Sequence, residues 1–249
     1  MDIKKEVGWL LKEKYFNKPS KKFYSDVKRL EAGEPVDYVI GFADFFGCKI
    51  DLSKKPLIPR PDTEFWVEQA VEEIKKAKQK NIKCLDIFSG SGCIGITVLK
   101  HFKSLLCDFV DIDKNNLNQI KINCKLNKIN PKRVRIVLSD VFNNISVKNK
   151  YDFIFANPPY VAIKRKNKVQ KSVLKYEPKI ALFSGSDGLF VIKKFLKQAK
   201  KYLNPDGKIF MEFGSEQKKE IEKMIKKYKY LSYEFHKDQA GKWRWVVIK

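Results

Sequence analysis

Histidine is nearly absent from this chain of 249 residues, which contains only His101 and His236. The two are far apart, and neither has a carboxylate or thiolate partner at ligand spacing, so we expect no metal site. The five cysteines are odd in number and form no C-x-x-C pair, which argues against a disulfide framework. We therefore expect the cysteines to be reduced residues of the protein core.

Long apolar runs are also missing. No segment approaches the roughly 18 uninterrupted apolar residues of a membrane span, and the first five residues lack the apolar segment of a secretion signal. Hydrophobic residues still make up 43% of the chain, enough to fill the core of one α/β domain with a small accessory piece. These features predict a cytoplasmic protein with no membrane partner, and we expect it to be a monomer.

Arginine is scarce as well, since six arginines stand beside 46 lysines, and the formal net charge is +23. Such a charge favours phosphate-rich partners. The lysines are spread along the whole chain, however, which indicates a generally basic, solvated surface more than a dedicated nucleic-acid groove. The segment 164–168, Lys-Arg-Lys-Asn-Lys, is the one local cluster.

The N-terminal part of the chain carries apolar residues at helical spacing. In residues 1–33 this pattern is broken once by a Pro-Ser turn, so we expect two short helices there. Aromatic and apolar residues around a glycine predict a hairpin over 41–52. Prolines between 56 and 61 then exclude regular structure and lead into a helix capped at Asp62 or Thr63.

From residue 82 onward, strands and helices alternate. We expect the first four strands at 82–88, 105–112, 134–139 and 151–156. A helix over 187–203, a turn at 204–207, a strand over 208–213 and a terminal antiparallel pair at 231–236 and 243–248 complete the pattern. Such alternation predicts a Rossmann-like α/β fold with a mostly parallel, seven-stranded sheet and helices on both faces.

A glycine-rich loop follows the first of these strands. Gly90, Gly92 and Gly95 match G-x-G-x-x-G, and glycine lets a backbone turn tightly and approach a ligand closely. The next strand ends at Asp111, 21 residues after Gly90, close to the offset of about 20 residues at which a carboxylate binds ribose hydroxyls. The pattern alone does not separate adenosylmethionine from a nicotinamide dinucleotide.

Four further positions near this loop are Gly95, Asp86, Asp140 and Val141. The first three each have two interpretations. We favour a packing role for Gly95 over a ligand role. Asp86, in the strand before the loop, either orients the loop or reaches the amino group of a methionyl tail. Asp140, beside Val141 at the end of the third strand, suits an adenine amino group and ring face, or else caps a helix.

The motif Asn157-Pro158-Pro159-Tyr160 comes directly after the fourth strand, where an open α/β sheet presents catalytic groups. Two prolines fix the backbone, so the Asn157 side-chain carbonyl and the Pro158 backbone carbonyl can accept hydrogen bonds from one NH2 group while Tyr160 packs on its planar face. An amide nitrogen is a poor nucleophile, so the rate of transfer must depend on holding this nitrogen in line with the methyl group. The motif predicts methyl transfer to a planar nitrogen.

With these residues in place, the chain resembles the HemK/PrmC release-factor glutamine methyltransferases over about residues 31–249. The segments that carry the resemblance, besides the tetrapeptide, are Glu-Pro-Val-Asp-Tyr-Val-Ile-Gly at 34–41, Leu-Ile-Pro-Arg-Pro-Asp-Thr-Glu at 57–64, Tyr-Glu-Pro-Lys-Ile-Ala-Leu at 176–182, Gly-Ser-Asp-Gly-Leu at 185–189 and Asp-Gln-Ala-Gly at 238–241. The second of these resembles the family's proline-arginine signature.

The resemblance implies a class I methyltransferase fold that uses S-adenosyl-L-methionine to methylate the glutamine of the Gly-Gly-Gln motif in a class I peptide chain release factor. It implies a substrate-recognition region over 1–53 and a catalytic domain over 54–249, and it places Arg60 and Glu64 in the pocket wall or in a helix-start ion pair. Residues 157–160 would hold the substrate, with Asn157, Pro158 and Tyr160 catalytic. The implied cofactor residues are Asp86, Phe88, Ser89, Gly90, Ser91, Gly92, Asp111, Asp140, Val141 and Asn157.

Two features depart from the family pattern. Phe88 stands where the family usually has a glycine, and the helical region before Glu34 is short. Three alternatives follow from the residues: an amino-group methyltransferase of rRNA, tRNA or DNA that uses the same tetrapeptide, a non-catalytic ribosome-associated binding protein, and a nicotinamide oxidoreductase. The last leaves the tetrapeptide without a role.

Overall fold

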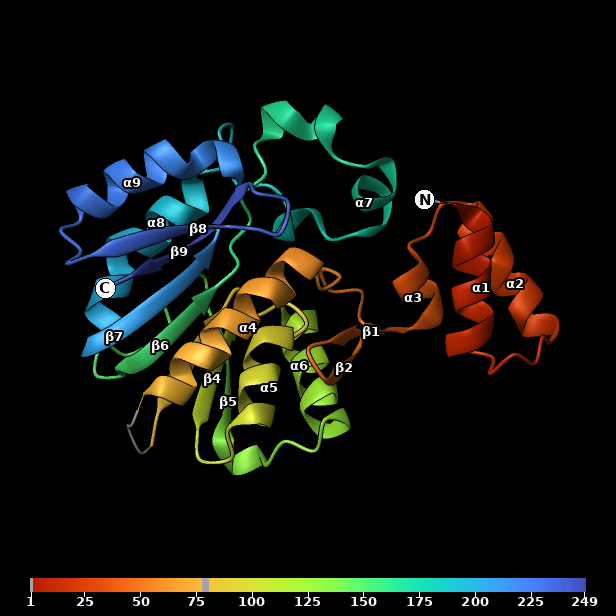
Figure 1. Ribbon diagram of the computed structural model, residues 1–249, viewed down its shortest axis with the longest axis horizontal. Helices are drawn as coiled ribbons and strands as arrows, with labels where there is room; N and C mark the ends of the chain where they lie inside the picture. The colour runs from red at the N-terminus through yellow and green to blue at the C-terminus, as the bar shows by residue number, and fades with distance from the viewer. Residues whose placement is uncertain (1, 78–80) are drawn as a thin grey trace.

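The computed structural model describes residues 2–77 and 81–249. A seven-stranded sheet in the order β5-β4-β3-β6-β7-β9-β8 lies at its centre (Figure 1). The parallel strands are β3 (Lys83–Ile87), β4 (Leu106–Asp111), β5 (Val134–Leu138), β6 (Tyr151–Ala156) and β7 (Leu203–Glu212). The antiparallel pair is β8 (Tyr233–Lys237) and β9 (Trp243–Ile248). The predicted Rossmann-like fold is confirmed.

Helices cover both faces of this sheet. One face carries α4 (Pro61–Lys76), α5 (Cys93–His101) and α6 (Lys114–Leu126), and the other carries α8 (Phe190–Ala199) and α9 (Lys218–Lys227). Neighbouring residues of β3 alternate between the two layers, since Cys84 packs into the first core and Leu85 into the second. The central strands are therefore mainly apolar, as expected for a sheet buried on both faces, and the few buried carboxylates in them include Asp86, Asp111 and Glu212.

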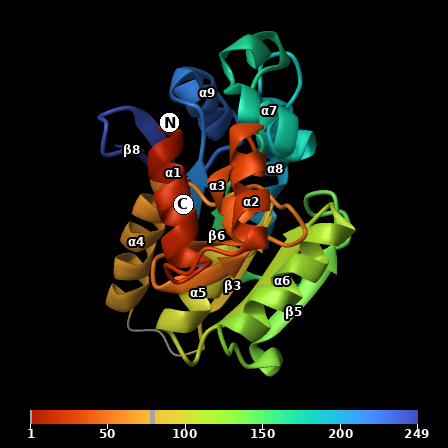
Figure 2. The ribbon, with the colours of Figure 1, turned by 90° about the vertical axis from the view of Figure 1, so that its right-hand side faces the viewer.

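The N-terminal helices form a separate small core beside the sheet (Figures 1 and 2). These are α1 (Ile3–Glu13), α2 (Lys21–Glu31) and the short α3 (Val36–Ile40). The buried Asp26 joins them, accepting hydrogen bonds from Lys14 Nζ and Tyr15 Oη, each at 2.7 Å. The two predicted helices are confirmed, whereas α3 was not predicted.

The predicted hairpin is present as β1 (Phe42–Phe45) and β2 (Cys48–Asp51). It is anchored to the end of α6, because Asn123 Oδ1 accepts a hydrogen bond from Asp51 N at 2.7 Å and Asn127 Oδ1 accepts one from Lys49 N at 3.2 Å. The hairpin thus connects the N-terminal helices to the layer of α5 and α6.

Some predicted boundaries are wrong. Helix α4 begins at Pro61 and not after a cap at Asp62 or Thr63, because a proline suits the first helical turn, where its missing N–H has no partner to lose. Helix α8 is shorter than predicted, and a 3₁₀ turn, η4 (Lys200–Tyr202), follows it. The expected turn at 204–207 lies inside β7 as a bulge, where the register with β6 shifts.

The connection between β6 and β7 forms a lobe above the carboxyl ends of the strands (Figure 1). It contains η2 (Ile163–Lys168), α7 (Lys171–Tyr176) and η3 (Lys179–Ala181). Two further 3₁₀ turns are η1 (Pro131–Arg133) and η5 (Ser215–Gln217). Among the described residues, no helix is both long and apolar enough to cross a membrane.

Candidate active site

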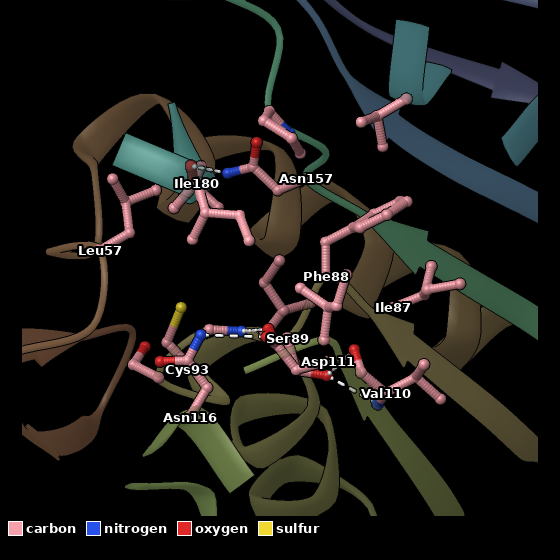
Figure 3. Close-up of a pocket in the computed structure, with 18 of the residues that line it drawn as sticks. Leu57, Ile87, Phe88, Ser89, Cys93, Val110, Asp111, Asn116, Asn157 and Ile180 are labelled. Carbon is pink, nitrogen blue, oxygen red and sulfur yellow. Dashed lines mark hydrogen bonds between the residues drawn. The ribbon is translucent and has the colours of Figure 1, made fainter. Parts of the chain in front are cut away.

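A cavity lies at the carboxyl ends of β3, β4, β5 and β6, next to the switch point of the sheet between β3 and β6. Figure 3 shows Asn157 on one side of it and Ser89, Asp111 and Asn116 on the opposite side. The predicted site residues that line it are Phe88, Ser89, Gly90, Ser91, Asp111, Asp140, Val141, Asn157 and Pro159. Asp86, Gly92, Pro158 and Tyr160 are not in its wall.

The loop after β3 turns through left-handed backbone conformations. Gly90 has φ +54° and Gly92, at the start of α5, has φ +79°. Phe88 also has a positive φ, +63°, a conformation that costs a non-glycine residue roughly 1–2 kcal/mol. The positive φ explains why the family that the chain resembles usually has a glycine at the position of Phe88. The Phe88 ring is accommodated by an edge-on contact with Phe195, with the ring centroids 5.8 Å apart.

Asp111 connects the loop to the end of β4. Its Oδ2 accepts a hydrogen bond from Gly90 N at 2.8 Å, and its Oδ1 accepts bonds from Asp113 N at 2.9 Å and Asn116 Nδ2 at 3.1 Å. Burial raises the pKa of Asp111, and these donors partly offset the effect. A carboxylate has about four acceptor positions, so capacity remains for a ligand. Asn116 was missed in the sequence, although it lies on the first turn of the helix that follows Asp111.

Asp86 lies beneath the loop and is fully buried. Its Oδ2 accepts a hydrogen bond from Gly95 N at 2.9 Å, while no described residue donates to Oδ1. Burial raises the pKa of Asp86 well above its usual range. Of the two interpretations of this residue, the contact with Gly95 matches the one in which Asp86 orients the loop.

Gly95 packs against the sheet, where an added Cβ would lie 2.4 Å from Phe109 Cε1. We expect Gly95→Ala to lower the free energy of unfolding by up to about 2 kcal/mol, because overpacking a core typically costs about 1–3 kcal/mol and the helix regains about 1 kcal/mol. Gly8→Ala is the matched control, since Gly8 in α1 has no atom within 4 Å of the added Cβ. Chemical denaturation should show that this control is stabilised. A stabilised Gly95→Ala would contradict the packing role.

Asp140 and Val141 line the cavity at the end of β5. Lys194 Nζ on α8 donates to Asp140 Oδ2 at 2.5 Å. No helix begins after Asp140, so the capping interpretation is wrong. Val141 has φ +55°, which is rare for a β-branched residue, and such strain concentrates at functional sites.

The tetrapeptide after β6 is held by a network of buried side chains. Asn157 Nδ2 donates to Thr63 Oγ1 at 3.2 Å, and Tyr160 Oη donates to Glu212 Oε1 at 3.1 Å. Gln217 Nε2 donates to the Tyr160 carbonyl at 2.9 Å. The Tyr160 hydroxyl is thus directed to Glu212, and Asn157 and Pro159 are the members that line the cavity.

Glu212, at the end of β7, receives two further hydrogen bonds. Thr63 Oγ1 donates to its Oε2 at 2.6 Å and Trp66 Nε1 donates to the same oxygen at 2.8 Å. Burial raises the pKa of Glu212, while the three donors and the charge of Arg244 act in the opposite direction. The sequence analysis missed this residue, although a carboxylate inside the apolar strand Ile-Phe-Met-Glu-Phe was a signal.

Glu177 joins two parts of the cavity wall. Its buried carboxylate accepts hydrogen bonds from Arg60 Nη2 at 2.6 Å and from Ile58 N at 3.1 Å. Ile58 and Arg60 line the cavity on one side, and Ile180, three residues after Glu177, lines it from the lobe. Glu64 instead accepts a hydrogen bond from Phe46 N at 2.7 Å and does not line the cavity. Of the two interpretations of Arg60 and Glu64, the ion pair between them is wrong, and the position in the pocket wall holds for Arg60 alone.

All five cysteines are buried and free. Among residues 2–77 and 81–249, no group of three or more histidine, cysteine or acidic side chains could hold a metal ion.

The chain is similar in sequence to known methyltransferases. The model of the methyltransferase small domain matches residues 68–187. A release factor glutamine methyltransferase of Lactococcus lactis is 33% identical over 98% of this chain and 88% of its own length. One of Clostridium botulinum is 36% identical over 96% of this chain and 80% of its own length.

Solved structures show the same fold at low identity. A methyltransferase from Pyrococcus furiosus is 22% identical, with a TM-score of 0.57 over 82% of this chain and 88% of its own. A 16S rRNA methyltransferase of T. thermophilus, solved with AdoMet and guanosine, is 14% identical, with a TM-score of 0.59 over 84% of this chain and 49% of its own. The match to methyltransferases points to a cofactor of the S-adenosylmethionine type.

Proposed function

Because this chain belongs to the release factor glutamine methyltransferase family, we propose that it methylates the glutamine of the Gly-Gly-Gln motif in a class I peptide chain release factor, using S-adenosyl-L-methionine. The methyl group goes to the side-chain amide nitrogen. The observation that carries the proposal is the position of Asn157, whose side chain lies in the wall of the cavity opposite the ribose acid Asp111 (Figure 3).

The cavity wall suits adenosylmethionine. Asp111 combines a buried carboxylate with one remaining acceptor position, which suits a ribose hydroxyl. Asp140 and Val141 offer an acceptor and an apolar surface to the adenine, and the loop from Phe88 to Ser91 faces the rest of the cofactor. When bound, the cofactor supplies an electrophilic methyl group, and the protein must bring a nitrogen in line with it.

Positioning of the substrate nitrogen is the task of the tetrapeptide. The Asn157 Oδ1 atom, in the cavity wall, accepts a hydrogen bond from the glutamine NH2 group, and this bond strengthens as the N–H group becomes more acidic during transfer. Correct alignment of two reactants can contribute about 7–11 kcal/mol to catalysis. No side-chain base is needed for the step, since the proton can leave to water after the methyl group has transferred.

The N-terminal region is assigned to substrate recognition. Residues 1–53 form helices with their own core and a hairpin that connects them to α6. They lie across from the lobe that contains α7 (Figure 1). We propose that residues 1–53 contact the release factor and that residues 54–249 form the catalytic domain.

Incubation with methyl-labelled adenosylmethionine tests the class of substrate. Purified release factor and total RNA are offered in parallel, and the label in the protein and RNA fractions is counted. Label in the release factor supports the proposal. Label in RNA alone would assign the chain to the nucleic-acid amino methyltransferases, and no label in either fraction would contradict the proposed activity.

A further inference from the structure

A short chain of hydrogen bonds connects Glu212 to the catalytic motif through Thr63. Thr63 Oγ1 lies 2.6 Å from Glu212 Oε2 and 3.2 Å from Asn157 Nδ2. Thr63 and Glu212 are only 2% and 1% exposed, so water does not compete for these contacts. The three residues come from α4, β7 and the loop after β6, which meet only in the folded protein.

The direction of this hydrogen-bond chain follows from the chemistry of its members. A threonine hydroxyl has one proton to donate and two lone pairs to accept with. Thr63, Trp66 and Tyr160 all direct a donor at the Glu212 carboxylate, an arrangement that suits its charged form. The Thr63 hydroxyl therefore donates its proton to Glu212, and toward Asn157 it can only accept a hydrogen bond.

The Asn157 amide is therefore fixed in one of its two orientations. Its NH2 group must face Thr63, because the reverse orientation would place the amide oxygen against a lone pair. No described residue donates a hydrogen bond to Asn157 Oδ1, and Asn157 lines the cavity, so this oxygen is left to a ligand. A flipped amide would present N–H groups to the N–H groups of the substrate.

We propose that Glu212 and Thr63 are positioning residues that keep Asn157 Oδ1 available as an acceptor and thereby make the site specific for substrates with an N–H group. This inference rests on the function proposed above. Thr63 lines the cavity beside Asn157, whereas Glu212 lies behind it and does not line the cavity. Their effect is transmitted through the orientation of one amide group, and it depends on the Thr63 hydroxyl more than on the volume of its side chain.

Two substitutions at Thr63 separate the hydroxyl from the packing. Thr63→Val keeps the branched shape and removes the hydroxyl, whereas Thr63→Ser keeps the hydroxyl and removes a methyl group. We expect Thr63→Val to lower kcat by up to about 100-fold, the loss typical of a misplaced reacting group, with a much smaller change in KM. Thr63→Ser should retain most of kcat. Both variants should still bind adenosylmethionine, which confirms that they fold.

Wild-type kcat in Thr63→Val would overturn the inference. An equal loss in Thr63→Ser and Thr63→Val would also overturn it, because the effect would then come from packing and not from the hydroxyl.

NMR of protein labelled with [15N]asparagine tests the orientation without any substrate. The side-chain NH2 signals of Asn157 are assigned by their loss in Asn157→Asp. We expect one slowly exchanging Asn157 amide proton in the wild type and in Thr63→Ser, and fast exchange of both protons in Thr63→Val. Unchanged exchange in Thr63→Val would contradict the hydrogen-bond chain. This result stands even if the wild type transfers no methyl group, an outcome that would refute the proposed function alone.

Discussion

Asn157→Ala should lower the rate of methyl transfer by about 100- to 1000-fold, the range seen when one hydrogen-bonding group that acts in a transition state is removed. The substitution deletes the acceptor that faces the substrate nitrogen, and it leaves Asp111 and the glycine loop in place. Single-turnover kinetics at saturating cofactor measures the loss. Titration calorimetry should show that adenosylmethionine still binds with little change in affinity.

Asn118→Ala is the matched control for this variant. Asn118 is exposed on α6, makes no side-chain hydrogen bond to the described residues and does not line the cavity. Its removal should change neither the rate nor the affinity. If Asn157→Ala turned over at the wild-type rate, the role assigned to the tetrapeptide would be wrong.

Asp111→Ala should weaken the binding of adenosylmethionine by about 10- to 150-fold. A hydrogen bond to a charged group contributes about 1.5–3 kcal/mol, and the acceptor position that remains on this carboxylate can take one ribose hydroxyl. The loss is increased because Asp111 also accepts hydrogen bonds from Gly90 N and Asn116 Nδ2, so its removal loosens the loop that we propose to bind the cofactor. Equilibrium binding by titration calorimetry measures the effect.

Asp113→Ala controls for the loss of a carboxylate at the same end of the sheet. Asp113 caps α6 by accepting a hydrogen bond from Asn115 N at 2.8 Å and does not line the cavity. Its removal should cost about 0.5–2 kcal/mol of stability and leave the cofactor affinity nearly intact. An unaltered dissociation constant in Asp111→Ala would remove Asp111 from the ribose site.

Much of the fold follows from local patterns in the sequence. The period of apolar residues changes from helical to extended at each element of the sheet, and the strands buried on both faces are mainly apolar. The order of strands then depends on general rules for parallel sheets, which bring Gly90, Asp111 and Asn157 to one edge. These three positions could be predicted because each follows directly from the end of a strand.

The residues that support the tetrapeptide could not be found in this way. Thr63 is 94 residues from Asn157 and 149 from Glu212, and no local pattern records which distant side chains share a hydrogen bond. Thr63 was instead predicted as a helix cap, a local role that its hydroxyl does not take because it is bound to Glu212. The partner of Glu177 was missed for the same reason, since Arg60 lies 117 residues away.

Mass spectrometry of the release factor after reaction with the wild-type protein tests the central claim most directly. The factor is digested, and the methyl group is located by fragmentation of the peptide that contains Gly-Gly-Gln, with a factor in which this glutamine is replaced by asparagine as the control. We predict one methyl group on the side-chain amide of the glutamine and none in the control. A methyl group on any other residue, or equal methylation of the control, would contradict the claim.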